Sequence, residues 1–176
     1  MRYDQLLAYV QEYAPSSILE VGTWNGHRAV QMLNIVPDAK YCGFDLFEDA
    51  TEVTDAEEKN VKPHHTLASV RHLLSPFNAE LHKGNTRETL PKLTGQFDFV
   101  WLDGGHSIET IESDWKWARI CLAPGAMVLF DDYYTGPIDT EKFGCNKIVE
   151  RHRHVVLPAA DPVSGGGWVQ MVRVWP

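Results

Sequence analysis

Five acidic residues end or directly follow apolar runs in this sequence, and carboxylates at such places can bind hydroxyl groups or cations. They are Glu20, Asp45, Asp103, Asp131 and Asp132. A carboxylate avoids burial unless it is paired or ligated. Acids at the ends of buried strands therefore indicate a ligand that carries a positive charge, hydroxyl groups or both. Which ligand they predict depends on the elements that bring them together.

The segment EVGTWNG, residues 20–26, places two glycines between an apolar run and a helical pattern, which is typical of a tight strand-to-helix turn. Asp45 follows Gly26 by 19 residues, where an acid on the next strand can accept hydrogen bonds from ribose hydroxyls. The dinucleotide pattern GxGxxG is absent, and Glu20 would disfavour a nearby pyrophosphate. A nucleoside cofactor with a cationic, amino-acid-like end fits this turn better.

Apolar runs alternate with helical periodicities along the chain, which predicts an α/β fold with a mostly parallel sheet. We expect a doubly wound, seven-stranded sheet with helices on both faces and an antiparallel C-terminal hairpin. The expected helices are Tyr3–Tyr13, His27–Leu33, Leu67–Leu74, Ile108–Ala118 and Lys142–His152. The expected strands are Ser17–Val21, Tyr41–Phe47, Ala79–Asn85, Phe97–Gly105, Gly125–Asp132, Val155–Pro158 and Trp168–Trp175.

Composition places the chain among ordinary water-soluble domains. Its 176 residues are 44% hydrophobic and 23% charged, with a formal net charge of −8, and they predict one domain spanning residues 1–176. The sequence has no basic stripe of the kind that nucleic-acid-binding proteins carry. It also has no apolar run that is long enough to cross a membrane. The three cysteines form no CxxC pair, and the first residues do not resemble a secretory signal. We therefore expect a cytoplasmic protein.

The segment ILEVGTWNG, residues 18–26, resembles the first motif of class I S-adenosylmethionine-dependent methyltransferases. The resemblance implies a Rossmann-like fold that binds S-adenosylmethionine, with Asp45 as the ribose-binding acid and residues 84–86 lining the adenine. The cofactor-binding residues that it implies are Glu20, Gly22, Thr23, Trp24, Asn25, Gly26, Asp45, Gly84, Asn85, Thr86 and Asp103.

The second half, with the segments FVWLDGGHSIETIESDW, LAPGAMVLFDDYY and GCNKIVE, resembles small-molecule O-methyltransferases related to the catechol and caffeoyl-CoA enzymes. It looks closest to a bacterial subgroup with a DGxH motif. Such relatives commonly hold one Mg²⁺, which implies Asp103, Asp131 and Asp132 as ligands, and oxygen ligands suit this ion. His106 stands where these relatives carry a catalytic lysine. A histidine can still accept a hydroxyl proton, so His106 and Asp103 are the predicted catalytic residues.

The predicted function is methyl transfer from S-adenosylmethionine to a hydroxyl of a small molecule, assisted by Mg²⁺. Two alternatives remain: a metal-independent methyltransferase in which the three acids are structural, and a non-catalytic S-adenosylmethionine-binding protein. Asp131 and Asp132 could also form a plain turn, His106 could merely begin a helix, and the acid run 48–58 could be a solvated face. The segment before the first strand is short, so we expect another part to close one side of the substrate site. That part is either a homodimer partner or residues 48–76.

Overall fold

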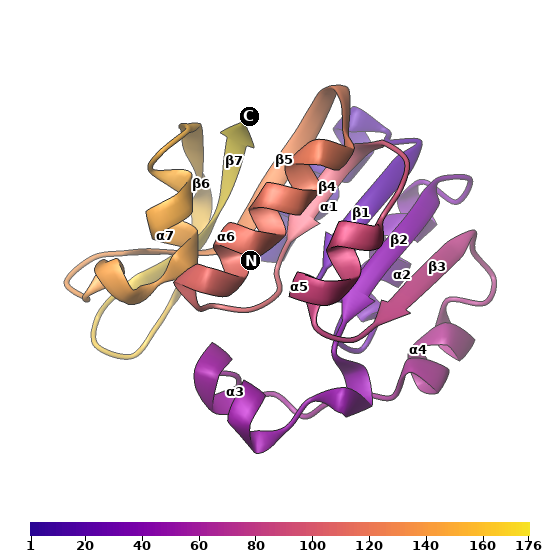
Figure 1. The fold of residues 1–176 in the computed structure, drawn as a ribbon. Coiled ribbons are helices and arrows are strands. Elements are labelled where there is room, and N and C mark those ends of the chain that lie inside the picture. Colours follow the sequence, from indigo (N-terminus) through magenta and orange to yellow (C-terminus); the bar gives the residue numbers. More distant parts are fainter.

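One seven-stranded sheet organises the chain, and a computed structural model describes all of residues 1–176. The strand order is β3-β2-β1-β4-β5-β7-β6, with β7 antiparallel to its neighbours β5 and β6 and the other pairs parallel (Figure 1). This topology confirms the predicted doubly wound sheet and its C-terminal hairpin. The strands are β1 (Ser17–Val21), β2 (Lys40–Asp45), β3 (Ala79–Lys83), β4 (Phe97–Leu102), β5 (Leu122–Thr135), β6 (Arg153–Pro162) and β7 (Trp168–Trp175).

Helices cover both faces of the sheet, and each face has its own apolar core. α1, α2 and α4 pack on one face and α5, α6 and α7 on the other, whereas α3 stands away from the sheet beyond the strand ends (Figure 1). The helices are α1 (Arg2–Tyr13), α2 (His27–Ile35), α3 (Glu52–Glu58), α4 (Leu67–Leu73), α5 (Thr86–Thr89), α6 (Ile108–Ala118) and α7 (Gly144–Val149). Short 3₁₀ turns occupy Phe47–Asp49, Leu90–Lys92, Arg119–Cys121 and Thr140–Lys142.

The order of the strands reverses between β1 and β4, and ligands of open α/β sheets bind at such a reversal. The turn after β1 lies directly against the end of β4 here. Gly22 has a φ of 95°, and a Cβ on it would lie 2.0 Å from the carbonyl oxygen of Asp103. Only glycine fits this approach, so the turn is set by its contact with β4 as well as by its own backbone.

β5 differs from its expected course. The expected strand Gly125–Asp132 is only the middle of the observed one, which runs from Leu122 to Thr135. The register against β7 shifts after Phe130, and Asp132 has a φ of 59°. Asp131 and Asp132 therefore lie in a bulge within β5, not in a turn after it. Such bulges redirect side chains, which explains how two adjacent acids reach the same site.

Other boundaries also differ from the expected ones. β2, β3 and β4 end two or three residues before their expected ends, and the residues left out belong to the loops and turns that follow these strands. The expected helix Lys142–His152 is divided into a 3₁₀ turn and α7, since Phe143 between them has an extended backbone. β6 is longer than the expected Val155–Pro158 because it pairs with β7 along most of its length.

None of the helices combines the length and the apolarity that crossing a bilayer would need.

Candidate active site

A cavity of about 680 Å³ lies at the carboxyl ends of the parallel strands. Its wall continues from α1 and α2, past the strand ends, to α3 and α5. The predicted site residues in its wall are Glu20, Gly22, Thr23, Trp24, Asn25, Asp45, Asn85, Thr86, Asp103 and His106. The structure thus brings most of the predicted cofactor and catalytic residues to one cavity.

Four predicted residues do not line this cavity. Gly26 and Gly84 have φ angles of 74° and 124° and shape the turns beside it. Gly26 is also packed against Val70, which a Cβ would approach to 2.8 Å. Asp131 and Asp132 line a small adjoining hollow together with Asp103. The two glycines therefore act through backbone shape, and the two acids act from beside the cavity.

Glu20 is the most enclosed acid of the cofactor end, with 1% of its surface exposed. The Tyr41 hydroxyl donates a hydrogen bond to its Oε2, whereas its Oε1 is buried without any partner. Burial raises the pKa of Glu20 to about 8, although the Tyr41 hydrogen bond lowers it in part. A buried acceptor in this state is best satisfied by a cationic donor such as an ammonium group.

Asp45, at the end of β2, is held by the backbone around it. Its Oδ2 accepts a hydrogen bond of 2.7 Å from the amide of Trp24, and its Oδ1 accepts one of 2.8 Å from the amide of Phe47. An ionised carboxylate has about four acceptor positions, so each oxygen keeps capacity for another donor. The carboxylate is fixed in orientation and can still accept from two hydroxyls.

His106 is bonded through both nitrogens. Its Nδ1 lies 2.6 Å from the carbonyl oxygen of Glu58, and its Nε2 lies 2.7 Å from Oδ2 of Asp132. A carbonyl oxygen can only accept, so Nδ1 carries the hydrogen. Burial opposes a charge on the ring, but the hydrogen bond and the charge of Asp132 outweigh burial, and the pKa of His106 is raised.

Glu58 connects α3 to the first turn of α6. Its carboxylate accepts from the amides of His106 and Ser107 at 2.7 and 2.8 Å, and from the hydroxyls of Ser107 and Thr110. These four bonds hold the pKa of Glu58 below its ordinary value despite the cost of burial. The acid run 48–58 is therefore not wholly a solvated face, which corrects the expectation from its composition.

Arg2 is the charged partner of the acids in β5. Its Nη1 lies 2.8 Å from Oδ1 of Asp131 and 3.0 Å from Oδ1 of Asp132, and its Nε lies 3.3 Å from Oδ2 of Asp161. Burial raises the pKa of Asp131 to about 6, and the neighbouring Asp132 adds to the rise. Burial also opposes ionisation of Asp132, but His106 and Arg2 lower its pKa to about 2.

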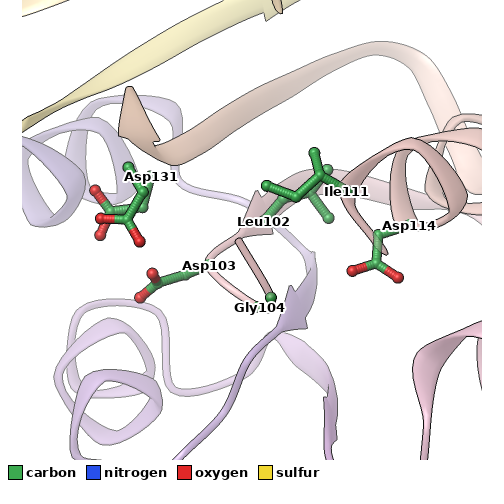
Figure 2. A pocket seen from close by; sticks show the side chains of 8 residues that line it. Leu102, Asp103, Gly104, Ile111, Asp114 and Asp131 are labelled. Carbon is green, nitrogen blue, oxygen red and sulfur yellow. The ribbon is translucent and has the colours of Figure 1, made fainter. Parts of the chain in front are cut away.

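Asp103 follows β4 and lies in the walls of both the cavity and the adjoining hollow. Figure 2 shows the carboxyl group of Asp103 on the side of Asp131, whereas Asp114 of α6 points to the other side of the segment between Leu102 and Gly104. Burial, with the charges of Asp131 and Asp132, raises the pKa of Asp103 well above its ordinary value. These surroundings disfavour the ionised form of Asp103.

The predicted magnesium site does not fit this arrangement. Mg²⁺ needs several oxygens near one point, at ~2.1 Å each. The one set of three metal-type ligands whose binding atoms all lie within 4.8 Å of one another is Cys42, Glu80 and His82, far from these acids in the sheet. Asp103, Asp131 and Asp132 do not form such a set, and the Arg2 guanidinium already forms ion pairs with two of them, although neither oxygen of Asp131 has a hydrogen-bond partner. The magnesium ion stays a prediction that the geometry does not favour.

Sequence reasoning missed three residues of this site: Arg2, Tyr41 and Glu58. Each acts on a partner far away in the sequence, and only Tyr41, at a buried position of a strand next to Glu20, gave a local signal. The 48–76 segment was one of two expected sources for a wall of the site. The residues that it contributes to the cavity are Thr54, Asp55, Glu57, Glu58, Asn60, Lys62 and His64.

Solved methyltransferases share this fold. The O-methyltransferase TomG from Streptomyces achromogenes, involved in tomaymycin synthesis and solved with S-adenosylmethionine, is 17% identical with a TM-score of 0.67, covering 98% of this chain and 78% of that one. An O-methyltransferase from Bacillus cereus, in complex with S-adenosylhomocysteine, is 16% identical with a TM-score of 0.67, covering 99% and 80%. The Podospora anserina methyltransferase PaMTH1, also bound to S-adenosylhomocysteine, is 16% identical with a TM-score of 0.66, covering 99% and 78%.

Sequence comparison gives the family directly. No curated protein sequence matches the chain. A family model described as a methyltransferase domain matches residues 19–133, which run from β1 into β5 and include Glu20, Asp45 and His106. This chain therefore belongs to that methyltransferase-domain family, in the S-adenosylmethionine-dependent class I fold.

Proposed function

We propose that this methyltransferase transfers the methyl group of S-adenosylmethionine to a hydroxyl of a small molecule. One observation carries the proposal: Oε1 of Glu20 is buried without a partner in the wall of the cavity that also contains Asp45. A cationic amino group at Glu20 and ribose hydroxyls at Asp45 would satisfy both acids with one molecule. A dinucleotide offers a pyrophosphate to the same turn and would leave Glu20 unpaired.

The cofactor, when bound, would supply a methyl group on a sulfonium, which is a good leaving group. The chain's residues would then orient the acceptor and remove its proton. Asp103, in the protonated form that burial favours, would donate a hydrogen bond to the acceptor oxygen. In the free protein both ring nitrogens of His106 face acceptors, so the ring must first lose its Nε2 proton to solvent and the acceptor hydroxyl must replace Asp132 at that nitrogen. His106 would then take the hydroxyl proton at Nε2, with Nδ1 still held by the Glu58 carbonyl and the resulting charge stabilised by the nearby Asp132. No step runs through a metal, because Arg2 already bonds Asp131 and Asp132.

The first test is calorimetric titration of S-adenosylhomocysteine into the protein, with NAD as the comparison ligand. We expect micromolar binding of S-adenosylhomocysteine and none of NAD. Glu20→Leu should weaken the binding, because it removes the acceptor for the ammonium group. Asp38→Asn, an exposed change outside the cavity, serves as the control. Absence of binding in the unaltered protein would refute the proposal.

The second test separates an enzyme from a cofactor-binding protein. Labelled S-adenosylmethionine is incubated with phenolic, catecholic and sugar hydroxyl acceptors, and methylated product is counted. The enzyme should release S-adenosylhomocysteine in step with product for at least one acceptor class, and His106→Ala should lose most of that turnover. Tight cofactor binding without product from any class would favour the non-catalytic alternative.

A further inference from the structure

We propose that Arg2 is the resident cation of an acid site formed by β5 and β6, and that methyl transfer in this protein therefore needs no divalent metal. The acid site is defined here as Asp131, Asp132 and Asp161, the three carboxylates around the Arg2 guanidinium. The inference rests on the proposed methyltransferase function and adds how the acceptor end of the site is neutralised.

The contacts of Arg2 enclose its guanidinium among acids. Nη1 lies within 3.0 Å of an oxygen of both Asp131 and Asp132, and Nε lies 3.3 Å from Asp161. Only 11% of the Arg2 side chain is exposed, and the Asp131 side chain is fully enclosed. Ion pairs at the surface contribute little, but removing one partner of an enclosed pair leaves an uncompensated charge and is strongly unfavourable. The acids and Arg2 therefore depend on each other.

The position of Arg2 is fixed by its neighbours in α1. Its Nη2 donates a hydrogen bond of 3.0 Å to the Tyr3 hydroxyl. One turn further along, the Gln5 side chain donates to the carbonyl of Ala159 and accepts from its amide, at 3.4 and 2.9 Å. This pair of bonds ties the first turn of α1 to the edge strand β6. The guanidinium is thus delivered to the acid site by the packing of a helix, not by a freely moving side chain.

A guanidinium and a divalent ion compete for the same atoms here. Mg²⁺ between Asp131 and Asp132 would need an oxygen from each, and the outer oxygen of Asp132 is engaged by His106 at 2.7 Å. The remaining oxygen of Asp132 already accepts from Arg2. Arginine is always charged in proteins, so it supplies a positive charge beside the acids at every working pH. A divalent ion could bind both acids only after displacing the guanidinium from Oδ1 of Asp132.

Arg2 also acts on His106 through Asp132. The two oxygens of Asp132 are divided between them, Oδ1 to Arg2 and Oδ2 to His106. A carboxylate held at one oxygen presents the other in a set direction, so Arg2 is a positioning residue for the imidazole. Removing Arg2 should release the carboxylate for other partners, including a metal ion.

The test measures metal binding, not only activity. Mg²⁺ is titrated calorimetrically into the unaltered protein, Arg2→Met, and Arg2→Met with Asp131→Asn. Arg28→Met is the matched control, because Arg28 also packs on Tyr3, with its guanidinium carbon 3.9 Å from the ring centroid, but has no contact with the acid site. Mg²⁺ is used because its preference for oxygen ligands keeps it from Cys42, Glu80 and His82.

The expected result is no saturable Mg²⁺ binding by the unaltered protein or by Arg28→Met. Arg2→Met should bind Mg²⁺ saturably, and at least about tenfold more tightly than Arg2→Met with Asp131→Asn. Methyl transfer by the unaltered protein should continue in excess EDTA. Mg²⁺ binding by the unaltered protein that Asp131→Asn removes, or turnover that stops in EDTA, would overturn the inference.

These outcomes are separable from failure of the proposed function. Binding of S-adenosylhomocysteine reports the cofactor end and does not involve Arg2. A protein that binds this ligand but requires Mg²⁺ for turnover refutes the role of Arg2 alone. A protein that binds neither S-adenosylhomocysteine nor Mg²⁺ refutes the proposed function. Its failure to bind Mg²⁺ still agrees with Arg2 as the resident cation. If Arg2→Met does not fold, the titration of the unaltered protein and the EDTA assay decide the question.

Discussion

The two ends of the active site carry acids of the same kind in opposite states. At the cofactor end, Glu20 has a free buried oxygen and Asp45 has unused acceptor positions. At the acceptor end, Arg2 and His106 already pair with Asp131 and Asp132. An acid at a strand end therefore does not by itself indicate a ligand. What distinguishes Glu20 is that no cation of the chain pairs with it, whereas Asp131, whose oxygens also lack hydrogen-bond partners, has its charge paired with Arg2.

The largest effect on turnover should come from a change at the acceptor end, where His106 is the proposed base. His106→Ala should lower kcat by about 10²- to 10⁴-fold, since a positioned base typically contributes this much. The dissociation constant for S-adenosylhomocysteine should hardly change. Steady-state kinetics and calorimetry measure the two quantities. His72→Ala on the exposed side of α4 is the control, and full turnover by His106→Ala would show that the acceptor end has no base there.

At the cofactor end, Glu20 should make binding depend on pH. Because burial raises the pKa of Glu20 to about 8, the free protein holds this carboxyl protonated at neutral pH. A bound ammonium favours the ionised form, so binding releases a proton. Affinity for S-adenosylhomocysteine should rise as pH increases towards 8, by up to about tenfold per pH unit. Calorimetry in buffers of different ionisation enthalpy counts the proton, and Glu20→Gln should release none. An equal pH slope in Glu20→Gln would end the assignment of an ammonium to this site.

Asp45→Asn tests whether the open acceptor positions of Asp45 are used. The amide keeps one oxygen, so one backbone bond can persist, but one charged acceptor for the ribose is lost. We expect S-adenosylhomocysteine to bind about tenfold more weakly, as for loss of one hydrogen bond to a charged group. Adenine alone, which has no ribose, should not discriminate between the two proteins. A loss of equal size for adenine would instead indicate a disturbed turn.

The smallest effect is expected for Glu58, which joins α3 to the first turn of α6. Glu58→Gln should reduce the free energy of unfolding by about 1 kcal/mol, because it weakens the cap on α6. The pKa of Glu58 is lowered in the folded protein, so its contribution is present above the ordinary carboxylate range and is lost as pH falls through the folded pKa. Urea unfolding at neutral and acidic pH measures it. Exposed Glu57→Gln is the matched control, and equal losses in both would mean that the four bonds of Glu58 add nothing.

The predictable parts of this molecule are those with a local signal. Strands β1 and β7 were placed with their observed ends, because their boundaries coincide with changes from apolar to polar or turn residues. Glu20, Asp45 and His106 could be placed for the same reason: each lies at or near the end of a strand, and the topology brings these ends together. In a parallel sheet, residues at the carboxyl ends of different strands lie at the same side of the sheet.

The rest could not be predicted because it depends on contacts with no local pattern. Arg2 lies 129 and 130 residues before its partners in β5, and a single arginine before a helix carries no signal. Glu58 looks like its acidic neighbours until α6 is placed beside it. The bulge at Asp132 requires a left-handed backbone in a residue other than glycine, which composition does not announce.

The antiparallel direction of β7 has a practical consequence for handling the protein. Val174 of β7 pairs with Val128, near the start of the part of β5 that is parallel to β4. The chain therefore leaves the sheet at the strand ends that face away from the cavity. Figure 1 shows the C-terminus at the upper tip of β7, far from α3, and the N-terminus near the middle of the view. An affinity tag or a surface tether attached after Pro176 leaves the cavity mouth open. One attached before Met1, which lines the cavity, would crowd the entry of both small molecules.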